Sequence, residues 1–210
     1  MKGHKWFAAI YDRQMAFVEK RWLAKVREEL VGTATGKVLE IGAGTGANFP
    51  YYREGAQVIA TEPDQYMVEN ARKKLQESGN GQIELLQAPA EELPFEDDSF
   101  DVVVGTLVLC SVRSQEKALS EIRRVLKPGG QFRSYEHVRY GSPVGAFFQD
   151  LIQPVWSWFG AGCHPNRDTL RSIKDAGFEI EQAKTKNTFP PIPPMICARP
   201  HLKAIVRSPD

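Results

Sequence analysis

In Lys37-Val-Leu-Glu-Ile-Gly-Ala-Gly-Thr-Gly46, a short apolar run leads directly into three alternating glycines. The apolar run predicts a buried strand, and glycine after it lets the backbone turn sharply and pass close to a ligand where a Cβ would collide. Glu62 closes the next apolar run, residues 57–61, and follows Gly42 by 20 positions. An acid at that distance accepts hydrogen bonds from the hydroxyls of a bound ribose in such a unit. Together the two features predict a nucleotide site.

Outward from this loop, apolar runs alternate with stretches of helical spacing, the latter over residues 64–78 and 114–126. Predicted strands span 37–41, 57–61, 83–87, 101–106 and 131–136, with later candidates at 178–183 and 202–206. Such alternation predicts an α/β fold, Rossmann-like and doubly wound, with a mostly parallel sheet covered on both faces. Lys127-Pro-Gly-Gly130 is expected to stop the second helix, and the prolines of 190–200 to form an extended loop.

The amino-acid composition excludes several classes of protein. The chain has 210 residues, 42% hydrophobic, which suits one domain with a single core. Lys and Arg total 27 against 26 Asp and Glu, so no net field favours nucleic acid. The three cysteines form no close pair in sequence, so neither a zinc knuckle nor a disulfide framework is expected, and no metal ligands are assigned. No apolar run approaches the roughly 18 residues of a membrane span. We therefore expect a cytoplasmic protein with at most a peripheral membrane contact.

The glycine spacing alone leaves the nucleotide open. Gly42, Gly44 and Ala47 also fit the relaxed dinucleotide fingerprint, so an NAD(P)-dependent oxidoreductase competes, although no clear Tyr-x-x-x-Lys pair accompanies it. Glycines after a strand can also be simple turn residues. Glu40, two positions before the first glycine, favours a ligand with an ammonium group and disfavours a pyrophosphate. The acid therefore points to a cationic ligand.

Downstream motifs carry a more specific resemblance. Ala90-Glu-Glu-Leu-Pro-Phe-Glu-Asp-Asp-Ser-Phe-Asp101 and Arg124-Val-Leu-Lys-Pro-Gly-Gly130 resemble signatures of class I methyltransferases that depend on S-adenosylmethionine (SAM). Over about residues 36–180 the chain is similar to the methyltransferase-like thiol methyltransferases of animals and their bacterial relatives. That similarity rests on Gly44-Thr-Gly-Ala-Asn-Phe49, residues 102–112, Gln115-Glu116, Glu136-His-Val138, Gly162-Cys163 and Arg167. The resemblance implies a seven-stranded sheet, SAM as cofactor and methyl transfer to a small molecule.

The same resemblance implies the cofactor contacts. The methionine end would be surrounded by Glu40, Gly42, Gly44 and Gly46, and the ribose would be bound by Glu62. The adenine would be bordered by Pro63, Met67, Ala90 and Glu91. Thr106 and Leu107 would line the cofactor after the fourth strand, and Tyr11 would close over it. Pro89 stands where the wider superfamily usually has Asp, so a side-chain hydrogen bond to the adenine amine is not expected there.

Methyl transfer from a sulfonium needs close approach, alignment and exclusion of water more than it needs a metal. His137, at the end of the fifth predicted strand, is the catalytic candidate, since it could deprotonate a thiol acceptor or stabilise its thiolate; a loop histidine without such a role is the alternative. Cys110 and Cys197 are expected to be small core residues. The predicted acceptor pocket comprises His137, Phe148, Trp156, Cys163 and His164.

Two flanking segments complete the predicted organisation. Residues 1–36 form an N-terminal helical cap, with apolar positions at Trp6, Ile10, Phe17, Trp22, Val26 and Leu30. Residues 37–210 form the SAM-binding methyltransferase domain, with an aromatic helical insertion at about 142–177 that serves as core, lid or membrane-facing surface. The predicted function is methyl transfer to a small, fairly apolar acceptor, with a thiol as candidate. A lipid or quinone methyltransferase and a non-catalytic SAM-binding protein are alternatives.

Overall fold

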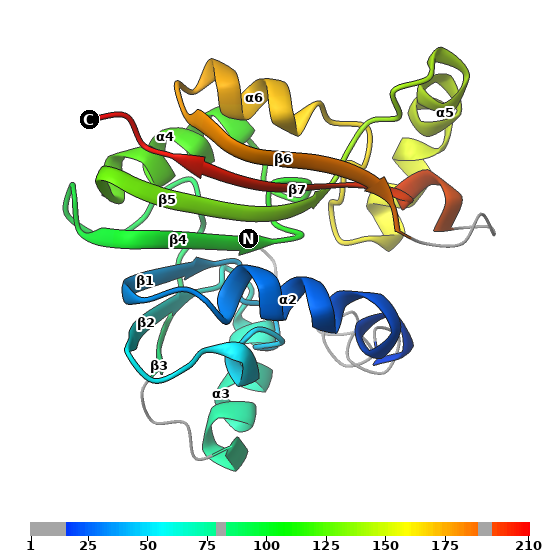
Figure 1. Cartoon of the computed structure of the whole chain (residues 1–210). Coiled ribbons are helices and arrows are strands. Elements are labelled where there is room, and N and C mark those ends of the chain that lie inside the picture. Colours follow the sequence, from blue (N-terminus) through cyan, green and yellow to red (C-terminus); the bar gives the residue numbers. More distant parts are fainter. Residues whose placement is uncertain (1–15, 79–82, 189–194) are drawn as a thin grey trace.

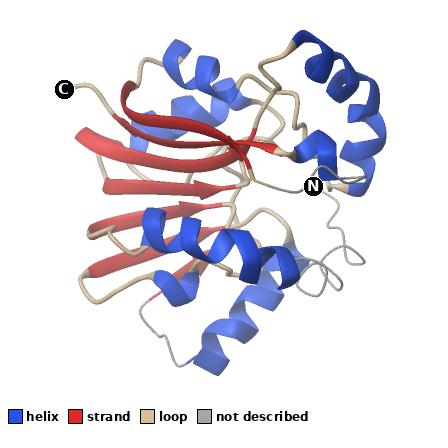
Figure 2. Ribbon diagram, turned by 45° about the vertical axis from the view of Figure 1, so that its right-hand side comes forward, coloured by secondary structure: helices blue, strands red, loops and turns tan. Residues whose placement is uncertain are grey.

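The computed structural model describes residues 16–78, 83–188 and 195–210, which form a single seven-stranded sheet with helices on both faces (Figures 1 and 2). The strand order is β3-β2-β1-β4-β5-β7-β6. The strands are β1 Gly36–Ile41, β2 Ala56–Thr61, β3 Ile83–Leu86, β4 Phe100–Thr106, β5 Leu126–His137, β6 Glu179–Asn187 and β7 Pro200–Arg207. The helices are α2 Ala24–Val31, α3 Gln65–Ser78, α4 Gln115–Val125, α5 Pro143–Phe159 and α6 Thr169–Asp175, with short turns η1 Glu19–Leu23, η2 Phe49–Tyr51 and η3 Met195–Ala198.

The first five strands run parallel, and β7 pairs antiparallel with both β5 and β6. The apolar run of β1 is central to the sheet, and its Val38, Leu39 and Ile41 side chains are fully buried. Because β1, β4 and β5 are parallel neighbours, the loops after Ile41, Thr106 and His137 meet at one edge of the sheet. Ligands bind at this carboxyl edge in open α/β sheets. The predicted fold class is confirmed.

Each face of the sheet has its own apolar core. Helices α4 and α6 pack on one face, where Leu119, Ile122 and Ile173 are fully buried. Helices α2 and α3 cover the other face through Leu30, Val31 and Ala71. Fully burying a side chain of leucine size is worth roughly 1.5–3 kcal/mol. These two cores fix the strands whose ends carry the site.

The N-terminal helix follows the predicted stripe at Leu30, which is fully buried, and at Trp22 and Val26, which pack half-buried against the core, but departs from it at Phe17. Phe17 is 70% exposed, whereas Leu23 is fully buried. The cause is the π-helical turn η1, which adds a residue to the turn and rotates the positions before it relative to α2. Trp6 and Ile10 lie outside the described residues.

Two expectations about loops were wrong in part. Helix α4 ends at Val125, one residue before the predicted end. Lys127-Pro-Gly-Gly130 belongs to β5, whose pairing with β4 shifts register between Phe100 and Val102. The positive φ of Gly129 accommodates this irregularity. Pro200 is the first residue of β7, a position that proline tolerates, and the prolines at 190–194 lie outside the described residues.

Helix α5 lies beyond the carboxyl edge of the sheet, at the upper right of Figure 1. Its N-cap is Ser142, whose hydroxyl accepts from the N–H of Gly145. The buried amide of Gln149 attaches it to the sheet, since its nitrogen lies within 3.1 Å of the carbonyl oxygens of Val138, Pro165 and Cys197. Most apolar side chains of α5 nevertheless face outward, and Trp158 is 78% exposed. No helix in the described ranges is long and apolar enough to cross a membrane.

Candidate active site

The three glycines after β1 have different tasks. All have positive φ values, +58° at Gly42 and Gly44 and +80° at Gly46, a region that glycine occupies without strain. A Cβ on Gly42 would lie 2.7 Å from a methyl carbon of Val108, and one on Gly46 would collide with the Phe49 ring. A Cβ on Gly44 would meet nothing within 4 Å. Gly42 and Gly46 therefore allow close packing, while Gly44 borders free space.

The Glu62 side chain is hydrogen-bonded directly to this loop. One oxygen of its buried carboxylate accepts the N–H of Gly44 at 2.9 Å, and the other accepts the N–H of Asp64 at 2.9 Å. Burial raises the pKa of Glu62, and the two backbone hydrogen bonds oppose that shift. Each carboxylate oxygen can accept a further hydrogen bond. The glycine loop and the acid that the sequence linked by spacing are thus in contact.

Glu40 lies beneath the loop in a fully buried polar group. Its carboxylate accepts hydrogen bonds from Asn48 at 3.0 Å and from the Tyr52 hydroxyl at 2.9 Å. Asn48 also donates to Thr106 at 3.2 Å and accepts from Arg27 at 2.6 Å. Sequence reasoning missed Asn48 as a connecting residue, although it stands just after the glycines. Desolvation raises the pKa of Glu40 to about 7, so its charge changes near neutrality.

This pKa predicts how the affinity for a cationic ligand depends on pH. A carboxyl group with a pKa of about 7 is mostly neutral at pH 6 and mostly ionised at pH 7.5. A nearby positive charge favours the ionised form, so affinity should rise several-fold over that interval and binding should release a proton. Calorimetry with SAM in buffers of different ionisation enthalpy measures both. Glu40→Gln should remove the proton release; unchanged release would place the titrating group elsewhere.

The other predicted cofactor residues surround the same edge, with one exception. Met67 and Ala90 are buried, Pro63 is half-buried, and Leu107 has a φ of +62° directly after β4. A non-glycine residue in that region is strained, a feature that concentrates at functional sites. The Glu91 carboxylate accepts the N–H of Arg113 at 2.7 Å and so also holds the loop before α4. Tyr11 lies outside the described residues.

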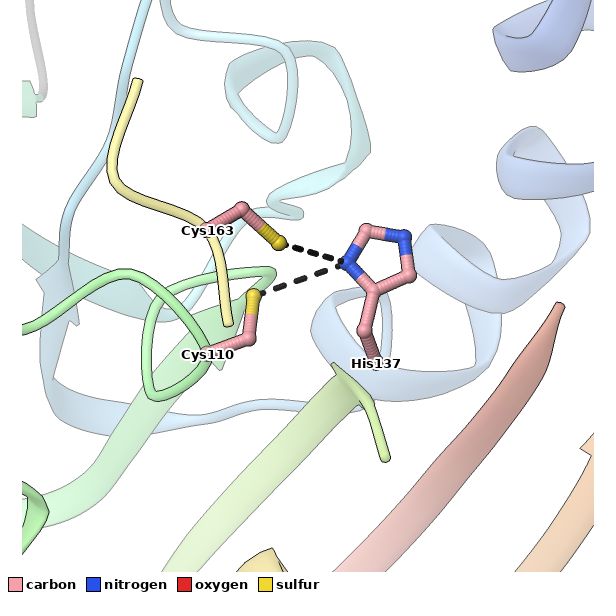
Figure 3. A group of neighbouring side chains, drawn as sticks. All are labelled: Cys110, His137 and Cys163. Atoms are coloured by element: carbon pink, nitrogen blue, oxygen red, sulfur yellow. Dashed lines mark hydrogen bonds between the residues drawn. The ribbon is translucent and has the colours of Figure 1, made fainter. Parts of the chain in front are cut away.

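The end of β5 and the loops after β4 and α5 bring together His137 and Cys163, which were predicted to share the acceptor pocket, and Cys110, which was not. The Nδ1 atom of His137 lies 3.4 Å from the Sγ of Cys163 and 3.6 Å from the Sγ of Cys110 (Figure 3). All three are largely buried, with His137 9% exposed. Contact between the thiols lowers the pKa of Cys163 and raises that of Cys110. Cys110 was expected only to fill the core, because nothing in linear spacing links it to His137. We call this group the Cys–His cluster.

Hydrogen bonds hold the loop after β4 against the loop after α5. The N–H of His164 donates to the carbonyl of Cys110 at 2.7 Å, and Arg167 donates to the carbonyl of Leu109 at 2.7 Å. Glu136, the residue before His137, accepts the N–H groups of Val108 at 3.0 Å and Cys110 at 3.1 Å. Burial raises the pKa of Glu136 well above its usual range. Val108 also packs against Gly42, so the cluster is connected to the glycine loop.

The remaining predicted pocket residues divide into two groups. Trp156 is half-buried beside Gly160 and Cys163, and the Nδ1 of His164 lies 2.5 Å from the Gln153 amide nitrogen, which places both next to the cluster. Burial lowers the pKa of His164, which favours the neutral ring. Phe148 is 53% exposed on the outer side of α5 and is not brought to the cluster. Only one face of a helix can pack against the rest of the protein, and Phe148 lies on the exposed face of α5.

A polar cavity of about 740 Å³ lies at the opposite end of the sheet, where β4 and β5 begin. Its lining includes Asp97, Arg123, Arg124 and Pro128. Hydrogen bonds from Arg124 to Asp97 and Glu121 hold this end together. The glycine loop and the Cys–His cluster both lie at the carboxyl edge, which makes that edge the candidate active site.

Comparison with known proteins identifies the family of the chain. Residues 39–133 match the methyltransferase domain family. Human thiol S-methyltransferase TMT1B is 40% identical over 174 residues, which cover 79% of this chain and 70% of that protein. The demethylmenaquinone methyltransferase of Clavibacter sepedonicus is 33% identical over 200 residues, covering 81% of this chain and 78% of its own length.

Solved structures agree on the architecture. A SAM-dependent methyltransferase from Aquifex aeolicus superposes with a TM-score of 0.68 at 18% identity, over 99% of this chain and 100% of its own. At that identity the likeness concerns the fold, and the sequence relatives carry the family assignment. This chain is therefore a class I SAM-dependent methyltransferase and belongs to the family that includes the thiol S-methyltransferases.

Proposed function

We propose that this enzyme transfers the methyl group of SAM to the sulfur atom of a small, apolar thiol. The observation that carries the proposal is the position of His137, which lies with Cys110 and Cys163 where β5 ends, at the edge of the sheet where ligands bind in open α/β folds. The relatives that are thiol S-methyltransferases, at 36–40% identity, support the same acceptor.

The residues at the glycine loop fit the cofactor. Gly44 borders space that a Cβ would fill, and the Glu62 carboxylate has lone pairs left for a ribose diol. Glu40 places a second acid beneath the loop, which suits the positive charges of the methionine end. SAM supplies a methyl group already activated by its sulfonium, so the protein has to align the acceptor and exclude water.

We assign His137 to the acceptor. A thiol reacts as its thiolate, and most alkyl thiols are protonated near neutral pH. The imidazole of His137 can take up the thiol proton or stabilise the resulting anion. The buried setting at the end of β5 excludes water from that step. Trp156, Cys163 and His164 would border the acceptor.

His137→Ala should lower turnover at neutral pH by about 10²–10⁴-fold, the range for loss of proton-transfer assistance, while SAM affinity stays unchanged. The lost rate should recover as pH approaches the pKa of the acceptor thiol, because hydroxide then supplies the thiolate. Initial rates with a small apolar thiol at about pH 6 to 9.5, in variant and wild type, measure this effect.

Calorimetric SAM titration of both proteins separates acceptor chemistry from damage to the cofactor site. Parallel pH profiles in variant and wild type would remove His137 from the acceptor chemistry. A wild type inactive toward thiols over the whole range would remove the thiol itself.

A lipid or quinone acceptor is the second candidate, and the outer face of α5 is the observation in its favour. Its exposed apolar side chains are Val144, Phe147, Phe148, Leu151, Val155, Trp158 and Phe159. Such a surface suits a peripheral contact with a membrane from which an apolar acceptor enters. Methyl transfer to a quinol or a phospholipid exceeding that to thiols would establish this alternative.

The organisation of the chain follows from the same proposal. Residues 1–36 would act as the N-terminal cap over the cofactor, and residues 142–177 as a lid over the acceptor. The three cysteines, all within the described ranges, form no disulfide, although Cys110 faces Cys163. That arrangement suits a reducing compartment, so we place the enzyme in the cytoplasm.

A further inference from the structure

The Cys–His cluster has the composition of a metal site. It presents two sulfur atoms and one imidazole nitrogen from three separate segments: the loop after β4, the end of β5 and the loop after α5. The three ligand atoms all lie within 4.8 Å of one another (Figure 3). Thiolate and imidazole ligands together select zinc and other thiophilic ions.

The distances within the cluster agree with tetrahedral zinc. Zn–S bonds of about 2.3 Å and Zn–N bonds of about 2.0–2.1 Å give a tetrahedral S···N edge of roughly 3.6 Å. The observed separations from the Nδ1 of His137 are 3.4 Å and 3.6 Å. The corresponding S···S edge of roughly 3.8 Å also lies inside the 4.8 Å limit. An ion can therefore be bound with little movement of the three side chains.

We propose that Cys110, His137 and Cys163 bind one Zn²⁺ ion and leave its fourth coordination position open. Three protein ligands and one exchangeable position are the arrangement of catalytic rather than structural zinc. Coordination through Nδ1 requires the proton of the neutral ring to be on Nε2. None of these residues is needed to close the sheet, because the strands are paired through their backbones.

Surrounding groups support such a site. Glu136 is not a ligand, since its two oxygens accept the N–H groups of Val108 and Cys110, and this holds the Cys110 loop in place. The exposed Ser111 lies next to the cluster, with its hydroxyl 3.6 Å from the Sγ of Cys110. Oriented ligands and a short path to solvent are both requirements of a metal site.

The role of the ion rests on the proposed function. A thiol that coordinates zinc loses its proton, which passes to solvent, and binds as the thiolate. Its sulfur then forms a bond to the methyl carbon of SAM as the bond between that carbon and the sulfonium sulfur breaks. The products are a methyl thioether and S-adenosylhomocysteine, with zinc unchanged. His137 would then stabilise the thiolate through the ion.

Metal binding can be measured without any methyl transfer. Untagged enzyme, reduced and freed of metal, would be dialysed against Zn²⁺ and its zinc content determined by mass spectrometry. We expect one ion per chain. Replacement by Co²⁺ should give a thiolate-to-metal charge-transfer band and the intense visible bands of tetrahedral cobalt.

Cys110→Ser and Cys163→Ser should abolish both signals, whereas Cys197→Ser, a buried cysteine outside the cluster, should retain them. Thermal unfolding of each apo protein controls for folding, and the wild-type measurement decides the proposal whether or not a variant folds. Wild type without zinc and without the cobalt bands would overturn it, as would equal binding by Cys110→Ser.

The outcomes for metal and acceptor are independent. Zinc binding without thiol methylation would uphold the metal site and refute the proposed acceptor. Thiol methylation by the metal-free enzyme, undiminished by a chelator, would uphold the acceptor and refute the role of the ion.

Discussion

Gly44→Val is expected to abolish SAM binding while leaving a cooperatively folded protein. The new side chain would project into the space beside the loop, where a Cβ meets no protein atom within 4 Å, and would occupy the place of the cofactor. Its backbone must also adopt a φ of +58°, which costs a β-branched residue on the order of 1–2 kcal/mol. Binding would be measured by calorimetry and folding by thermal denaturation.

Gly55→Val is the matched control. Gly55 also has a positive φ, +96°, and open space where a Cβ would lie, but it precedes β2 at the opposite edge of the sheet. It should show a similar loss of stability and normal SAM affinity. If Gly44→Val kept its affinity, or if both variants lost it equally, the glycine loop would not be the cofactor site.

Glu62→Ala is expected to weaken SAM binding by about 1.5–3 kcal/mol, the range for hydrogen bonds to a charged group, which is roughly ten- to hundredfold in Kd. The substitution removes the acceptor for the ribose and also releases the N–H groups of Gly44 and Asp64. Glu62→Gln retains one acceptor oxygen and should lose less SAM affinity than Glu62→Ala.

The control for Glu62 is Glu69→Ala, at an exposed position on α3. Its SAM affinity should equal that of wild type in the same titration. Wild-type affinity in Glu62→Ala as well would refute the assigned position of the ribose.

Much of the fold was predictable because its strands are short apolar runs separated by glycine-containing loops and by stretches of helical spacing. Residues 38–41 are buried between the two helical layers, and a continuous apolar run that leads into a glycine cluster identifies them as a strand of a parallel sheet. The contact between Gly44 and Glu62 was predictable for a related reason. Parallel strands β1 and β2 are adjacent and in register, so both carboxyl ends reach the same edge.

The complete Cys–His cluster could not be predicted in this way, since His137 and Cys163 were both assigned to the acceptor pocket but Cys110 was missed. Its members are separated by 27 residues between Cys110 and His137 and by 26 between His137 and Cys163. They meet because β4 and β5 are neighbours and because the N–H of His164 binds the carbonyl of Cys110. Both causes are tertiary contacts, which leave no periodic signal in the chain.

The predicted burial of Phe17 was wrong for a local reason. Helical spacing assumes 3.6 residues per turn throughout, and the π-helical turn Glu19–Leu23 breaks that assumption. For the stretch 144–159 the secondary structure was predicted correctly as a helix, but Phe148 was expected in the acceptor pocket and is exposed. An apolar helix face predicts burial against a partner, and here that partner is absent from the described residues.

The identity of the methylated atom decides whether this enzyme is a thiol methyltransferase. Wild-type enzyme would be given SAM with a deuterated methyl group and equal amounts of thiophenol, phenol and aniline, which present sulfur, oxygen and nitrogen on the same ring. Product masses would be followed over time, with Gly44→Val as the blank. We expect the label in methyl phenyl sulfide, with little in the ether or the amine. Label mainly in the oxygen or nitrogen product, or in none of the three, would contradict it.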